Sequence, residues 1–350
     1  MSANNPADGV EVRIDAGAAK TSAAPGTRRR AIAAWALWDW GASAYSTIVT
    51  SFVFAPYLTG VVAQNRPAGA LGGETWLAIS LFVAGFCVAA LAPVTGQRSD
   101  AGGRRKRSLA IWSALVIAST VGLFFVRDDY RYLWLGLVLL AAGSAFLEFA
   151  QVSYNAMLQQ ISNPGNVGRI SGLGWGSGYL GGIVVMLLAY VLFIEPEVGL
   201  FGVTVEGGLK YRALALVVAV WFAFWAIPIF LAVPEIPPTR GIPRVSFLGS
   251  YRVLVHDVRA LFRSDRHAVW FLLASALYRD GLVAIFSFGA VLAVSVYGLS
   301  AADVVIFGVA ANVVAAIGAG GAGIVEDRIG PKPVILGSLA ALVTTSIVLL

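Results

Sequence analysis

The chain has 350 residues, of which 58% are hydrophobic and only 13% are charged. Soluble globular domains carry about 25% charged residues, so the composition excludes an ordinary soluble domain. The formal net charge of +6 would suggest nucleic acid as the partner of a soluble protein. In a membrane protein, a surplus of Lys and Arg instead marks the loops that stay in the cytoplasm.

Residues 1–30 are rich in Ala, Gly and Ser and are predicted to form a flexible cytoplasmic tail. Nine apolar windows follow it. A helix that crosses a bilayer needs about 20 mostly apolar residues, whereas the strands of a membrane barrel need about 9–11 alternating ones. The windows therefore predict eight complete membrane-spanning helices and a ninth that runs off the end of the chain. They are Ala31–Leu58, Thr75–Gly96, Ser108–Val126, Tyr132–Leu158, Ile170–Phe193, Ala213–Val233, Ala268–Tyr297, Val304–Val325 and Val334–Leu350.

Lys and Arg are unevenly divided between alternate loops. Nineteen of the 25 lie in the N-terminal tail and in the loops after the second, fourth, sixth and eighth windows, and five lie in the other loops. Since Lys and Arg accumulate on the cytoplasmic side, the N-terminus and the even-numbered loops are expected to be inside the cell.

The spacing GxxxDxxG occurs twice, once after the second window and once after the eighth. The motif residues are Gly96, Asp100, Gly103, Arg104, Arg105 and Arg107 in the first copy, and Gly323, Asp327 and Gly330 in the second. The glycines allow a helix to end and turn closely against a neighbour. The aspartate can accept hydrogen bonds from the N-terminal amides of a facing helix, or pair with a cation. A plain basic loop that only sets topology is the alternative.

Because each copy lies two spans into a group of six, the repeat indicates a transporter built from two related halves. Residues 31–233 would form a six-helix bundle and residues 268–350 an incomplete second bundle. Between them, residues 234–267 begin with prolines and continue with apolar residues at helical spacing, which predicts an amphipathic helix on the inner membrane surface. A calmodulin-like or nucleic-acid partner for this helix is a weaker alternative.

The duplicated loop resembles the signature of the major facilitator superfamily. Three further stretches are similar to its vacuole-effluxer-like permeases, which have many bacterial members: WALWDWGASAYSTIVTSFVFAPYL (Trp35–Leu58), YNAMLQQISNPGNVGRISGLGWGSGYLGG (Tyr154–Gly182) and LYRDG (Leu277–Gly281). The resemblance covers Ala31 to the end. It implies an all-α integral membrane protein of two bundles in a bacterial cytoplasmic membrane. Superfamily members have twelve spans, so a chain with nine, six plus three, is expected to be truncated.

Four charged residues lie inside the predicted spans: Asp39, Glu148, Arg279 and Asp280. On insertion scales such a residue costs about 2.5–3.5 kcal/mol at a helix centre, and such residues usually mark a functional site. All four fall on spans one, four and seven, which the resemblance implies line the central cavity. Ser43 on span one and Gln151 and Asn155 on span four extend these positions along one helix face. The seven residues are therefore the candidate substrate and proton pathway. The alternative is that the charges only pair with one another and lock helices together.

An unpaired buried carboxylate tends to take up a proton. We therefore expect Glu148, Asp39 or Asp280 to exchange protons, with Glu148 as the first candidate. Arg279 would then bind the carboxylate of a zwitterion such as an amino acid.

Two further groups of residues have competing interpretations. Trp35, Trp38 and Trp40 could stack on a solute, but an interfacial aromatic belt is the favoured interpretation. The glycines of span five resemble a dinucleotide fingerprint in spacing, yet no βαβ unit accompanies them, so close helix packing is expected. Gly318, Gly320, Gly321 and Gly323 of span eight are interpreted in the same way.

These observations favour a secondary transporter that moves a small solute, such as an amino acid, by proton-coupled alternating access. No phosphate-binding GxxxxGK[ST] loop indicates ATP as the energy source. A non-transporting sensor or remnant of the same fold is the second hypothesis, and an integral membrane enzyme the third. The two histidines, His256 and His267, show no metal or triad spacing, and the single cysteine, Cys87, allows no disulfide. We expect no cofactor and no metal; the partners would be solute, protons and the lipid bilayer, not nucleic acid.

Overall fold

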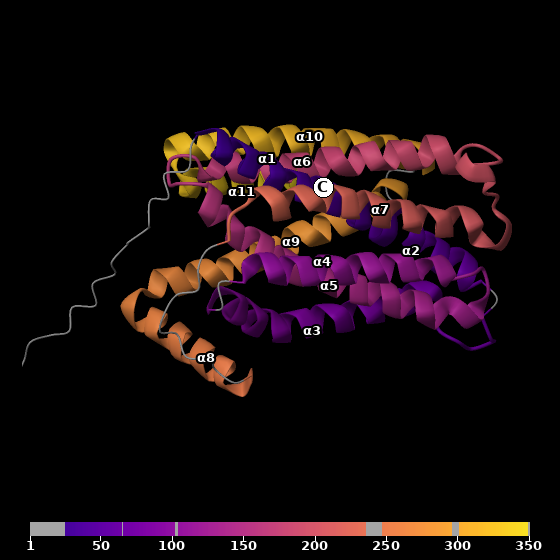
Figure 1. Ribbon diagram of the computed structural model, residues 1–350, viewed down its shortest axis with the longest axis horizontal. Coiled ribbons are helices and arrows are strands. Elements are labelled where there is room, and N and C mark those ends of the chain that lie inside the picture. Colours follow the sequence, from indigo (N-terminus) through magenta and orange to yellow (C-terminus); the bar gives the residue numbers. More distant parts are fainter. Residues whose placement is uncertain (1–24, 65, 102–103, 236–246, 296–300, 349–350) are drawn as a thin grey trace, which may run out of the picture.

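The computed structural model describes residues 25–64, 66–101, 104–235, 247–295 and 301–348, and this part of the chain is helical without a strand. Most of its long helices lie side by side along one axis, whereas α8 runs obliquely to them (Figure 1). The long helices are α1 (Pro25–Ala44), α3 (Gly73–Ala101), α4 (Arg105–Gly122), α5 (Leu133–Ile161), α6 (Val167–Ala189), α7 (Leu209–Ala232), α8 (Phe247–Ser264), α9 (Arg266–Ser295), α10 (Ala301–Ile329) and α11 (Pro331–Val348).

Eight helical segments in the described ranges are long and apolar enough to cross a membrane. They coincide with all the predicted windows except Ala268–Tyr297. The helix α9 covers that window with 30 residues, but many of its side chains lie outside the described part. The all-α membrane class is therefore confirmed, with eight candidate spans against the nine predicted.

The first span is not a continuous α-helix, which the sequence did not indicate. After α1 the chain is π-helical over Tyr45–Phe52 (η1) and again over Tyr57–Val62 (η2), with a single turn of α-helix, α2 (Phe54–Pro56), between them. The amide of Val53 donates to the carbonyl of Ile48, 3.1 Å away and five residues earlier. Such π segments are rare and are frequent at functional sites.

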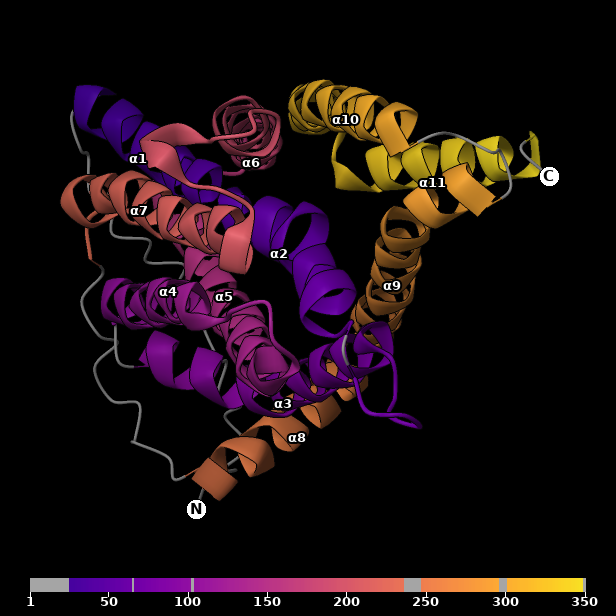
Figure 2. The same cartoon turned by 90° about the vertical axis from the view of Figure 1, so that its right-hand side faces the viewer.

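The helices α1 to α7, here called the N-terminal bundle, enclose the hydrophobic core. Its largest fully buried side chains include Trp35, Trp38, Tyr45, Tyr57 and Phe222. The helices α9 to α11, here called the C-terminal helices, lie along one side of the bundle: α10 meets α6, and α9 runs from beside α11 towards α3 and α8 (Figure 2). The contact between α6 and α10 is therefore the main junction between the two parts.

One end of the structure carries the beginnings of α1, α4 and α6 and the end of α10. We call it the arginine-rich end because Arg28–Arg30, Arg104–Arg107, Arg169 and Arg328 lie there. At this end α8 lies across the spans: in Figure 2 it is seen lengthwise beside α3, while α6 is seen end-on. The helix predicted within residues 234–267 is thus present, and residues 236–246 lie outside the described part.

Candidate functional site

The helix α6 lies between α1 on one side and α10 on the other, and glycines line both contacts. All six glycines of its central stretch are buried: Gly172, Gly174, Gly176, Gly178, Gly181 and Gly182. A helix surface without side chains lets a neighbouring backbone approach closely. The prediction of close helix packing for these glycines is confirmed.

On the α1 side, Asp39, Ser43 and Thr47 point at the glycine surface of α6. A Cβ atom at position 178 would lie 2.5 Å from Oδ2 of Asp39, and one at position 182 would lie 2.7 Å from Oγ1 of Thr47. Ser43 donates from its hydroxyl to the carbonyl of Trp40, 2.9 Å away. The sequence predicted Asp39 and Ser43 here but missed Thr47, because η1 begins at Tyr45 and changes the helical spacing.

Aromatic rings surround the same part of α1. The ring of Tyr154 on α5 stacks on Trp35 with a centroid distance of 4.4 Å and on Trp38 with 4.6 Å. The Nε1 atom of Trp35 donates to the carbonyl of Tyr154 at 3.1 Å, and that of Trp38 donates to Oγ of Ser113 at 3.1 Å.

The interfacial belt favoured for the three tryptophans is therefore wrong for Trp35 and Trp38, which are fully enclosed core residues. Their indole N–H groups find acceptors inside the bundle, so they do not need the membrane–water interface. Trp40 is half-buried and packs on Trp221 and Trp225 of α7 instead.

Glu148 lies on α5 of the N-terminal bundle and Arg279 lies on α9 of the C-terminal helices. Both side chains are exposed, although they lie within long apolar helices. Gln151 and Asn155 extend the accessible side of α5 from Glu148 towards its C-terminus. Each of the two parts thus carries an exposed charge within an apolar helix.

The other two predicted charges are Asp39 and Asp280. Asp39 is turned towards α6, and among the described residues it accepts no hydrogen bond and forms no ion pair. The side chain of Asp280 lies outside the described part of the chain. The described residues therefore do not show one shared cluster of four charges.

At the arginine-rich end, Asp327 of α10 holds the beginning of α6. Its Oδ1 accepts from the amide of Gly168 at 2.9 Å, and its Oδ2 accepts from the amide of Arg169 at 3.2 Å and from Nε of Arg169 at 2.7 Å. The structure therefore contains both interactions expected of the motif aspartate, a helix N-terminus and a cation.

The glycines of the second motif have separate roles. Gly330 adopts a left-handed φ of 85°, which ends α10, and its amide donates to the carbonyl of Glu326 at 2.8 Å. Gly323 lies directly against the backbone of Gly168. Gly318, Gly320 and Gly321 have open space around them among the described residues, so the packing role predicted for these three is wrong.

Only part of the first motif, Gly96–Arg107, lies among the described residues. Gly96 on α3 has room for a Cβ atom 3.4 Å from Val152 of α5. Arg105 donates from Nη1 to the carbonyl of Ala156 at 3.1 Å, while Arg104 and Arg107 are exposed. Gly103 and the side chain of Asp100 lie outside the described part.

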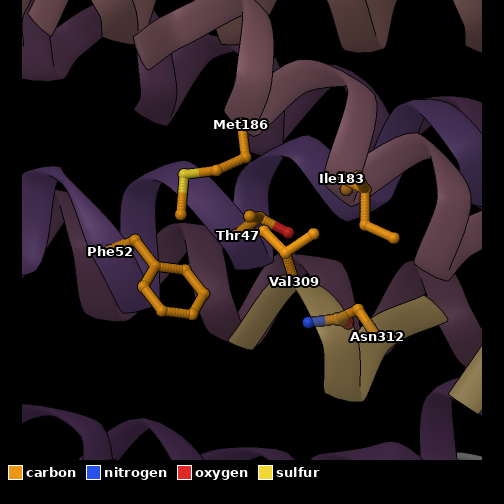
Figure 3. A pocket seen from close by; sticks show the side chains of 7 residues that line it. Thr47, Phe52, Ile183, Met186, Val309 and Asn312 are labelled. Carbon is orange, nitrogen blue, oxygen red and sulfur yellow. The ribbon is translucent and has the colours of Figure 1, made fainter. Parts of the chain in front are cut away.

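A small hollow lies between η1, α6 and α10, and it was not among the sites predicted from the sequence. Figure 3 shows Phe52 and Met186 on one side of it and Ile183 and Asn312 on the other, around Thr47 and Val309. Gly182 completes the lining. The hydroxyl of Thr47 and the amide of Asn312 are the polar groups in a mostly apolar wall. An uncharged polar residue such as Asn312 in an apolar span was the available signal.

Three comparisons with known proteins bear on this arrangement. Residues 162–349 match the model of the family described as "Vacuole effluxer Atg22 like". The chain is 27% identical over 251 residues to the uncharacterized MFS-type transporter YxiO of Bacillus subtilis, covering 71% of this chain and 56% of that protein. The chain thus spans about half the length of this curated relative.

The fold is similar to that of the proton:xylose symporter XylE of the major facilitator superfamily, bound to 6-bromo-6-deoxy-D-glucose. The TM-score is 0.63 over 88% of this chain and 71% of that one, at 13% identity, which shows the shared fold alone. These are families of transporters, not of enzymes. The chain belongs to the Atg22-like vacuole effluxer family, within the major facilitator superfamily.

Proposed function

We propose that the protein is a secondary transporter that moves a small solute across the cytoplasmic membrane by alternating access. The observation that carries this proposal is that both parts of the structure carry a charged residue within a long apolar helix, Glu148 on α5 and Arg279 on α9. Charged groups within spans are costly, and these two come from the two parts that alternating access would move against each other. The surplus of Lys and Arg at the arginine-rich end supports a cytoplasmic location for that end.

The contact at Asp327 supports a gate at this end. Asp327 belongs to α10 and its partners Gly168 and Arg169 belong to α6, so the contact connects the two parts. It would hold the cytoplasmic side closed and would break when that side opens. The residues of the first motif, Gly96–Arg107, would form the matching loop of the N-terminal bundle.

Arg279 is proposed to bind a carboxylate of the solute and Glu148 to exchange the coupling proton. A solute carboxylate would compete with Glu148 for the guanidinium, so binding of the solute and protonation of Glu148 would favour each other. An amino acid is the solute class that fits this pair, because its ammonium group could be held by a second carboxylate. Asp39 supports this role, since its carboxylate has no cation among the described residues.

The test is uptake of radiolabelled amino acids into liposomes that contain the purified chain, with and without an imposed proton gradient. The Glu148→Gln variant is expected to bind or exchange solute but to lose the response to the gradient. Glu74→Gln in the first turn of α3 is the matched control and should behave as the unmodified protein.

If the pH dependence of uptake is unchanged in Glu148→Gln, the proton role of Glu148 is wrong. Absence of flux for every amino acid, in a protein that remains folded, would favour the non-transporting sensor.

A further inference from the structure

The helix α8 has a face that contacts α3, an apolar face that overlaps it at Tyr251, and a basic face. Tyr251, Leu254 and Leu261 are half-buried, and the hydroxyl of Tyr251 donates to the carbonyl of Ala90 on α3. Most of the α3 surface is exposed, as expected for a helix that faces lipid. The contact therefore places α8 beside the outer surface of the bundle at its arginine-rich end (Figure 1).

The second face is apolar and uncovered. Val255, Val258 and Phe262 follow one another at helical spacing, so they form one strip along α8. Their exposed fractions are 47%, 45% and 41%. A strip of this kind continues the apolar outer surface of α3 instead of ending in water.

The third face is basic and lies next to the apolar strip. Arg252, Arg259 and Arg263 are seven and four residues apart and so share one side of α8, about a quarter turn from the strip. All three are exposed, and none forms an ion pair among the described residues. Asp257, the acidic residue of α8, lies on another side and is 3.6 Å from Nδ1 of His256.

We propose that α8 binds the surface of a bilayer that contains anionic phospholipid. Val255, Val258 and Phe262 would enter the boundary between acyl chains and headgroups, and the three arginines would contact the lipid phosphates. The occupant follows from continuity with the lipid-facing side of α3 and from charge complementarity. An apolar strip with an adjacent cationic row is the arrangement that interfacial helices use, and basic residues near an anionic leaflet each strengthen binding. This inference does not depend on the transport function.

The single cysteine of the chain makes a direct test simple. In a Cys87→Ser background, Val258→Cys places a reporter on the apolar strip, and Ala260→Cys places a matched control on the opposite side of α8. Both are labelled with an environment-sensitive fluorophore. The chain is then reconstituted into vesicles of phosphatidylcholine alone or of phosphatidylcholine with phosphatidylglycerol.

The label at position 258 is expected to show a blue-shifted emission that is larger in vesicles with phosphatidylglycerol, and the label at 260 should remain water-like in both. Replacing Arg252, Arg259 and Arg263 by Gln should remove the dependence on phosphatidylglycerol. A water-like label at 258 in both vesicles would overturn the proposal and would indicate a protein partner for this face. An equal shift in both vesicles would overturn the role of the arginines. Phe262→Cys serves as a second reporter if Val258→Cys disturbs folding.

Discussion

The two glycine-lined faces of α6 differ in what they meet. The face towards α1 receives mainly side chains, since Asp39 lies against Gly178 and Thr47 against Gly182, whereas Gly181 meets the backbone of Trp40. The face towards α10 receives mainly backbone, since Gly168 and Gly323 approach each other directly and the carbonyl of Ala319 lies against Gly172. One ion pair, between Asp327 and Arg169, closes this second face at the arginine-rich end.

This difference separates a fixed contact from one that can part. The side chains of α1 fill the spaces left by the glycines of α6, so the two helices interlock. Separating the helices would leave cavities in a close-packed interior. Two smooth surfaces of small residues can separate and meet again without such cavities, and their closed state then depends on a few polar contacts. We therefore expect changes on the α1 face to affect stability and changes on the α10 face to affect the closed state.

A side chain added to the surface of α6 that faces α1 should have the largest effect on stability. A Cβ atom at Gly181 would lie 2.9 Å from Cα of Trp40 and against its carbonyl oxygen, and neither can move alone. Gly181→Leu should lower the stability by more than the usual overpacking cost of about 1–3 kcal/mol, measured by thermal unfolding of the purified protein. Gly318→Leu, at a position with open space, is the control. Equal stability of the two variants would contradict an interlocked face.

Filling the α10 face should instead open the junction. Gly172→Leu places a side chain against the carbonyl of Ala319, and the strain can be relieved when α10 moves away. With a cysteine at Ala316, which is buried, in a Cys87→Ser background, thiol labelling should become roughly tenfold faster, equivalent to about 1.4 kcal/mol. The unfolding temperature should fall less than in Gly181→Leu. A large loss of stability without faster labelling would show that this face is also fixed.

Removing the ion pair between Asp327 and Arg169 should also open the junction between α6 and α10, but to a smaller extent. Asp327→Asn keeps the shape of the side chain but loses the charge that attracts Arg169 and the N-terminus of α6. Labelling of the cysteine at 316 should rise several-fold, because Arg169 is largely exposed and its interaction is screened. The same change at the neighbouring carboxylate, Glu326→Gln, should leave the labelling rate unaltered. If both variants label alike, Asp327 has no special part in closure.

The protonation of Asp327 should reproduce this effect. Its carboxylate accepts hydrogen bonds from the amides of Gly168 and Arg169 and from Nε of Arg169, and protonation in acid removes the charge that these groups stabilise. The labelling rate at 316 should be flat near neutral pH and should rise only in acid; a rise already near neutral pH would contradict the assignment.

The smallest effect on stability is expected when Asp39 is replaced. Its carboxylate has no hydrogen-bond or ion-pair partner among the described residues, and an unpaired buried charge is unfavourable. Asp39→Asn, which has nearly the same shape, should leave the unfolding temperature unchanged or raise it slightly. A marked fall would mean that the charged form has a stabilising partner.

The sequence predicted the class and the spans well, since these depend on apolar length and charge alone. It also predicted the kinds of interaction that Asp327 makes, with a helix N-terminus and a cation, and the glycine-lined packing of α6. These interactions follow from residue types at a fixed spacing, which the sequence shows directly. It did not predict that Asp39 faces the glycines of α6, a result of helix rotation that residue spacing within a span does not determine.

Two further errors have local causes. Thr47 was missed because the π-helix that begins at Tyr45 is not encoded in a recognisable pattern. Trp35 and Trp38 were placed in an interfacial belt because residue type gives no depth, whereas the acceptors Tyr154 and Ser113 that hold them inside the core lie on other helices.

The central claim is that α6 and α10 separate at the arginine-rich end during the working cycle. The direct measurement is the distance between spin labels at Leu173 and Ile324, both exposed, by pulsed electron paramagnetic resonance in liposomes, in a Cys87→Ser background. We expect two populations of distances, a shorter one for the closed state and a longer one for the open state, and we expect Asp327→Asn to increase the longer one. A single distance that is the same in both proteins would contradict it.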